Sequence, residues 1–166
     1  MRYVGVSLGH GTDREAEQWL STLDLPAGIA VCTHLTRTPY PHVVITFAAP
    51  DGVDVALPPM PSELDAVAGA AADAHAARRS GRAVRFRGVP TLTGTVTVEH
   101  VLAHTAIERV VVLGGRDASP DELLDTRDFV RPQWIDGTLT LVVMPAAGGR
   151  LVPFEVPDPT PCCADH

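Results

Sequence analysis

The most constraining feature of this sequence is an apolar run near its middle, in the stretch Ile107–Gly115 (Ile-Glu-Arg-Val-Val-Val-Leu-Gly-Gly). Residues 110–113 are all apolar, with no alternation of apolar and polar positions. A strand with this pattern is typically covered on both faces, as at the centre of a sheet. Gly114 and Gly115 follow at its carboxyl end, where open α/β sheets place their ligand crevices. We therefore expect a central buried strand with the rest of the chain packed around it.

Helix and turn patterns flank this run on both sides. Thr12 and Glu15 have the spacing of a capping box and predict that a helix begins there, and an Ala-rich segment over 63–79 predicts a second main helix. Asp51-Gly52 and Asp136-Gly137 each lie between strand-like segments and predict two β-hairpins.

The segment before the apolar run completes this expected architecture. Strand 82–87, a short helix over 98–106 and the central strand predict a right-handed βαβ unit. The fold class is therefore α/β, with α+β as the alternative: a mixed sheet of about seven to nine strands with two main helices and short extra ones.

The chain length bounds its organisation. A chain of 166 residues fits one domain, which we expect over 1–156, followed by an extended Pro-rich tail over 157–166 that ends in Cys-Cys-Ala-Asp-His. No apolar run approaches the roughly 20 residues that span a bilayer, and the N-terminus has no secretory signal pattern. The three cysteines are too few for a disulfide framework. We expect a cytoplasmic protein that binds no membrane.

The charged residues exclude several classes of chemistry. A net charge of −7 disfavours a nucleic-acid binder, whose surface is usually basic. All 13 basic residues are Arg, and the chain has no Lys and no Asn, a composition typical of a GC-rich bacterial genome. Without Lys there is no Schiff base for pyridoxal phosphate and no P-loop for a nucleotide.

The C-terminal tail holds the most unusual chemistry in the sequence. Cys162, Cys163 and His166 place two thiols and one imidazole within five residues, and these ligand types suit Zn²⁺ or Cu(I). A fourth ligand could come from Cys32 or His34 on a nearby strand. Alternatively, Cys162 or Cys163 acts as a nucleophile with His166 as its base, or the cysteines are inert.

A glycine-rich loop near the N-terminus is a second candidate site. Gly9, His10, Gly11 and Thr12 lead from a strand into a helix, whose free N–H groups attract anions. His10 could serve there as an acid, a base or a ligand. The alternative is an ordinary loop with a well-formed helix cap.

Two arginines form a third candidate site. Arg85 and Arg87 share one face of the expected strand 82–87 and could clamp a phosphate or a carboxylate. The alternative is that this basic patch, which also includes Arg78, Arg79 and Arg82, forms ion pairs with the acidic stretch 117–128.

These sites give three hypotheses of different class. The first is a metal- or thiol-dependent role centred on the C-terminal Cys/His cluster. The second is an enzyme or binding protein for a small anionic metabolite that uses the Gly9–Thr12 loop with Arg85 and Arg87. The third is a non-catalytic regulatory or assembly subunit, which includes a homo-oligomer.

Overall fold

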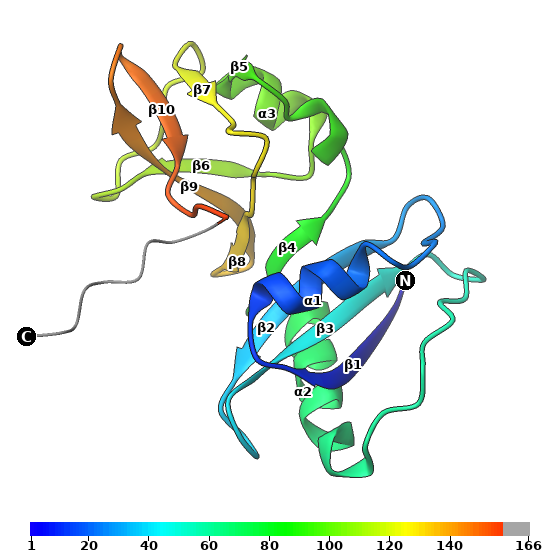
Figure 1. The fold of residues 1–166 in the computed structure, drawn as a ribbon. Coiled ribbons are helices and arrows are strands. Elements are labelled where there is room, and N and C mark those ends of the chain that lie inside the picture. The colour runs from blue at the N-terminus through cyan, green and yellow to red at the C-terminus, as the bar shows by residue number, and fades with distance from the viewer. Residues whose placement is uncertain (158–166) are drawn as a thin grey trace, which may run out of the picture.

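The structure, a computed structural model, describes residues 1–157 and contains ten strands and three α-helices within that range. Figure 1 shows them as two lobes that meet near strand β4. We call residues 1–81 the N-terminal lobe and residues 86–157 the C-terminal lobe.

The N-terminal lobe is a three-stranded antiparallel sheet with one helix on each face (Figure 1). Its elements are β1 (Arg2–His10), α1 (Asp13–Leu20), β2 (Ala30–Thr36), β3 (His42–Ala49), the 3-10 helix η1 (Ser62–Leu64) and α2 (Asp65–Ala76). β3 lies between β1 and β2, and all eight of its residues are buried. Ile45 and Phe47 pack towards α1, whereas Val44 packs towards α2.

β4 (Arg82–Arg85) pairs with β2 on one side and β8 on the other, and so carries the sheet from one lobe to the other. The elements of the C-terminal lobe are the 3-10 helix η2 (Val89–Thr91), β5 (Thr95–Thr97), α3 (Val98–His104), β6 (Arg109–Val112), β7 (Leu123–Asp125), β8 (Gln133–Ile135), β9 (Thr138–Ala146) and β10 (Arg150–Pro153). β9 is the hub of this lobe, because it pairs with β6, β8 and β10. Val101, Leu124 and Leu141 are among the residues of a second buried cluster that fills the lobe.

The predicted fold class is confirmed as a mixed sheet with helices packed against it. Among the strand pairings of residues 1–157, only β6–β9 and β7–β10 are parallel. The architecture therefore lies nearer to α+β than to a doubly wound α/β sheet. No helix in residues 1–157 is both long and apolar enough to cross a membrane.

The prediction of a central strand at Ile107–Gly115 is wrong. β6 pairs along its length with β9 alone, and its other side makes an isolated bridge between Val111 and Asp117. Val110 and Val112 are buried, but Leu113 is exposed. The apolar run misleads because the chain turns back at Gly114–Gly115, and the backbone of Arg116 accepts a hydrogen bond from Val112 N.

The two predicted Asp-Gly hairpins have different outcomes. Asp136-Gly137 joins β8 to β9, with φ angles of 49° and 80° that suit the tight turn of a hairpin. Asp51-Gly52 also forms a turn, closed by Val53 N donating to Pro50 O, but residues 53–57 form no strand. β3 is already paired on both edges, by β1 and β2, so no edge is left for a second arm. The two strands of the predicted βαβ unit, 82–87 and 108–113, are not neighbours in the sheet, since β8 and β9 lie between β4 and β6.

The Ala-rich helix α2 approaches the sheet very closely at Gly5. A Cβ atom at position 5 would lie 2.0 Å from the backbone oxygen of Ala68. The buried positions of α2 other than His75 are alanines, which have no side chain long enough to hold the helix away from the sheet. The missing side chain at Gly5 therefore sets the distance between α2 and β1.

We expect Gly5→Ala to lower the free energy of unfolding by about 1–3 kcal/mol, because the added methyl group overpacks this contact. Gly69→Ala, on α2, is the control, because a Cβ atom at position 69 would have no atom within 4 Å. Alanine inside a helix should raise the free energy of unfolding by about 0.5–1 kcal/mol relative to glycine. Denaturant unfolding of both variants tests this. An unchanged stability of Gly5→Ala would contradict the close packing of α2 on β1.

Candidate functional site

A cleft lies between the two lobes, formed by two hollows that share lining residues. The larger hollow has a volume of about 990 Å³ and the smaller about 360 Å³. Both are lined by Asp13, Leu35, Arg82, Gln133 and Glu155. We call the two together the interlobe cleft. Each hollow by itself is within the size range of small-molecule sites.

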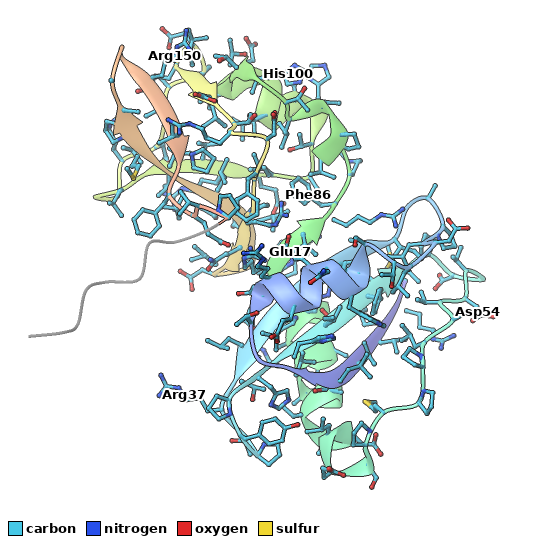
Figure 2. All side chains as sticks on the ribbon, viewed as in Figure 1. Glu17, Arg37, Asp54, Phe86, His100 and Arg150 are labelled. Carbon is cyan, nitrogen blue, oxygen red and sulfur yellow. The ribbon has the colours of Figure 1, made fainter. Side chains whose placement is uncertain are left out.

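Arg82, at the start of β4, is the centre of the charged groups in this cleft. Its Nε donates to Glu155 Oε1 at 2.6 Å and its Nη1 donates to Glu17 Oε1 at 2.7 Å. Arg131 also donates to Glu17, from Nε to Oε1 at 3.1 Å. Glu17 lies on α1 of the N-terminal lobe, whereas Arg131 and Glu155 belong to the C-terminal lobe, so these ion pairs connect the lobes. Figure 2 shows Glu17 at the junction.

The ion pairs are partly shielded from water. Arg82 and Arg131 have side chains only 12% and 15% exposed, and both guanidinium groups lie over the ring of Phe129, at 5.9 and 4.1 Å from its centroid. Burial by itself raises the pKa of Glu17, but the hydrogen bonds and charges of Arg131 and Arg82 outweigh it and hold that pKa below its ordinary value. Glu17 is therefore charged at neutral pH.

His34, Gly81 and Trp134 line the smaller hollow. Behind them a hydrogen-bonded chain runs into the core of the N-terminal lobe: His34 Nε2 and His75 Nδ1 each lie 2.9 Å from Thr46 Oγ1, and His75 Nε2 lies 3.4 Å from Cys32 Sγ.

Burial keeps the groups of this chain neutral. It lowers the pKa of His34 to about 4, and with the charge of His34 it lowers that of His75 to about 4. Burial raises the pKa of the Cys32 thiol to about 12, although a hydrogen bond with Trp134 acts in the opposite direction. Because the thiolate is the reactive form of cysteine, Cys32 and His75 do not make an activated nucleophile and base.

The Gly9–Thr12 loop leads into α1 as predicted, and its capping box is confirmed. The carboxylate of Glu15 accepts hydrogen bonds from Gly11 N at 2.6 Å and Thr12 N at 3.3 Å. These amides, which we expected to bind an anionic ligand, are thus already bound to an anion of the protein itself. Thr12 lines the larger hollow of the cleft.

His10 lies apart from the lining of that cleft, with its ring 5.8 Å from that of Trp19. Its Nδ1 is buried and has no hydrogen-bond partner in the part of the chain that the structure describes. A catalytic role of His10 stays a prediction.

The structure does not bring Arg85 and Arg87 together. β4 ends at Arg85, and Arg87 lies in the following turn. Arg85 Nη2 donates to the carbonyl oxygens of Leu25 and Pro26, at 3.0 and 2.8 Å, whereas Arg87 Nη2 donates to Thr105 O. The shared strand face that motivated the clamp is therefore wrong, and anion binding by either side chain stays a prediction.

The predicted metal ligands Cys162, Cys163 and His166 lie outside the described residues. Within residues 1–157, no group of three or more His, Cys, Asp or Glu side chains could hold a metal ion. His100 and His104 on α3, a pair at metal-ligand spacing, instead stack their rings at a centroid distance of 4.4 Å. Figure 2 shows His100 in the C-terminal lobe, away from Glu17.

Sequence reasoning missed the interlobe cleft. It expected Arg82 to pair with the acidic stretch 117–128, yet Arg82 pairs with Glu17 and Glu155, 65 and 73 residues away. The acidic stretch pairs locally instead, as between Arg116 and Glu122. No periodic pattern in the sequence links residues this far apart.

No protein-family model, curated protein sequence or solved structure significantly matches this chain. We therefore infer the chemistry of the cleft from its own geometry.

We expect Arg82→Gln to lower the free energy of unfolding by about 2–3 kcal/mol, since it leaves Glu17 and Glu155 half-buried with fewer partners. Arg2→Gln is the matched control. It breaks the pair between Arg2 and Asp54, whose side chains are both mostly exposed, and should change stability little. Denaturant unfolding at neutral pH compares the two variants. Equal effects would show that the Arg82 cluster does not hold the lobes together.

Proposed function

We propose that this protein binds a small molecule in the interlobe cleft. The observation that carries the proposal is that two hollows between the lobes share five lining residues: Asp13, Leu35, Arg82, Gln133 and Glu155. Apolar walls with a few converging polar groups are typical of ligand sites, particularly where two parts of a fold meet. The depressed pKa of His34 supports the same location, because perturbed titratable groups gather at functional sites.

Of the residues in the small-metabolite hypothesis, the cleft includes one from the Gly9–Thr12 loop but neither of the two arginines. Thr12 lines the cleft, as that hypothesis requires of the Gly9–Thr12 loop. Arg85 lines a separate hollow of about 360 Å³ beside Leu25, and Arg87 contacts the end of α3. Arg82 and its carboxylate partners line the cleft, whereas Arg85 and Arg87 do not.

A library of small amines, carboxylic acids and neutral aromatic compounds tests the proposal. The chain has two tryptophans, and Trp134 lines the cleft, so we expect ligands to shift its indole N–H signal in NMR spectra and leave that of Trp19 in place. Ser80→Phe, at an exposed residue of the cleft lining, should fill the smaller hollow and weaken binding. Ser119→Phe, at an exposed residue outside both hollows, is the control. A library without any compound that shifts Trp134 would disprove the proposal.

A second candidate is the metal- or thiol-dependent role of Cys162, Cys163 and His166. The supporting observation is the position of the last described residues. Glu155 is bonded to Arg82, and Val156 and Pro157 line the larger hollow. Cys162 and Cys163 follow Pro157 closely in the sequence. This short sequence separation supports a role of the two thiols in the chemistry of a ligand of the cleft.

We expect one equivalent of zinc or copper in the full-length protein purified without chelator or metal-affinity tag, and its loss in Cys162→Ser/Cys163→Ser. Cys32→Ala is the control. Cys32 is buried and its raised pKa disfavours the metal-binding thiolate, so this variant should keep the metal. Elemental analysis measures all three proteins. Equal metal content in the double variant and the wild type would rule out these cysteines as ligands.

A further inference from the structure

The guanidinium groups of Arg82, in the cleft, and of Arg131, beside it, are already bound to oxygen atoms of the protein. All three nitrogens of Arg82 contact carboxylates, of Glu17 or Glu155. Arg131 contacts Glu17 through two nitrogens and the Val130 carbonyl through the third. An anionic ligand of Arg82 or Arg131 would have to displace one of these internal partners, so these two arginines do not favour an anion.

Asp13 differs from the other acidic groups of the cleft. Among residues 1–157, its nearest recorded cation is Arg82, at 3.8 Å from Nη1 to Oδ1, which is beyond hydrogen-bond range. Its side chain is 42% exposed and lines both hollows. Asp13 is thus a carboxylate that lines the cleft and accepts no side-chain hydrogen bond from residues 1–157 that would occupy it.

The larger hollow also carries apolar side chains that the fold leaves uncovered. Leu35, Phe154 and Val156 line it and are 73%, 53% and 49% exposed. They come from different lobes, β2 in one case and the segment after β10 in the other two. A ligand with an apolar body would remove this surface from water, which is favourable in proportion to the area covered.

We propose that the ligand of the interlobe cleft is a small amphipathic cation, an ammonium or guanidinium group on an aromatic or aliphatic body. Its charge pairs with Asp13, and its body covers Leu35 and Phe154. The net charge of −7 favours the approach of cations over anions. This inference rests on the cleft being the binding site.

Three probes of the same shape and different charge test it: 2-phenylethylammonium, 2-phenylethanol and phenylacetate. In NMR titrations of the full-length protein followed at Trp134, the ammonium compound should bind about fivefold more tightly than the alcohol, and phenylacetate should bind most weakly. Added salt should weaken binding of the ammonium compound more than that of the alcohol.

Asp13→Asn should reduce the affinity for the ammonium compound to that for the alcohol. It leaves the Thr12–Glu15 capping box in place, so α1 should keep its start. Asp73→Asn, at an exposed residue of α2 outside the cleft, is the control and should leave the affinity unchanged.

The outcomes separate this inference from the proposed function. Equal or tighter binding of phenylacetate, or ammonium binding that Asp13→Asn does not alter, would overturn the cationic assignment while the cleft remains a binding site. Binding of other library compounds at Trp134 with none of the three probes would overturn it in the same way. If no compound of any charge shifts Trp134, both the inference and the proposed function fail.

Discussion

The position of one lobe against the other depends on the ion pairs around Arg82. The backbone joins the lobes through β4 and β8, where Ala83 N donates to Pro132 O at 2.7 Å and Trp134 N donates to Gly81 O at 3.0 Å. The Arg82 guanidinium then reaches Glu17 on α1 and Glu155 after β10. Partial burial strengthens these contacts, because charges attract more strongly where water is scarce. The shape of the cleft follows from this cluster.

The interior of the N-terminal lobe determines what lies behind the cleft. α2 presents alanines and His75 to the sheet, and His75 Nδ1 lies 2.9 Å from Thr46 Oγ1 on β3. Thr46 links His34 to His75, and burial lowers the pKa of both imidazoles to about 4. The wall behind the smaller hollow is therefore hydrogen-bonded and neutral at pH 7. The charged residues that line the cleft are Asp13, Arg14, Glu17, Arg82 and Glu155.

Local features of the fold could be predicted from the sequence. The Thr12–Glu15 capping box, the Asp136-Gly137 turn and the Ala-rich helix each depend on residues within a few positions of one another. Features that depend on which strands pair could not be predicted in this way. The Asp51-Gly52 turn forms, yet its second arm is excluded because β1, from the other end of the lobe's sequence, already occupies that edge of β3.

The candidate site was harder to predict than the fold for a related reason. The basic residues near Arg82 are conspicuous in the sequence, but whether an arginine is available to a ligand depends on carboxylates that reach it from distant segments. Arg85 and Arg87 donate to backbone carbonyls, and Arg82 donates to Glu17 and Glu155. The charges along the chain therefore predict a site for an anionic ligand. The hydrogen bonds that the arginines make within the protein favour a cationic ligand instead.

The exclusive use of arginine makes this arrangement feasible. A guanidinium group has a planar fork of donors that can meet carboxylates on two sides, whereas an ammonium group is a compact point charge that is more strongly hydrated. Arg82 can thus bind Glu17 and Glu155 from different lobes at once while its side chain is only 12% exposed. Once its donors are used in this way, Asp13, which lies beyond hydrogen-bond range of Arg82, is a carboxylate that can still accept hydrogen bonds from a ligand. The preference of the cleft for a cation is therefore a consequence of the same ion pairs that join the lobes.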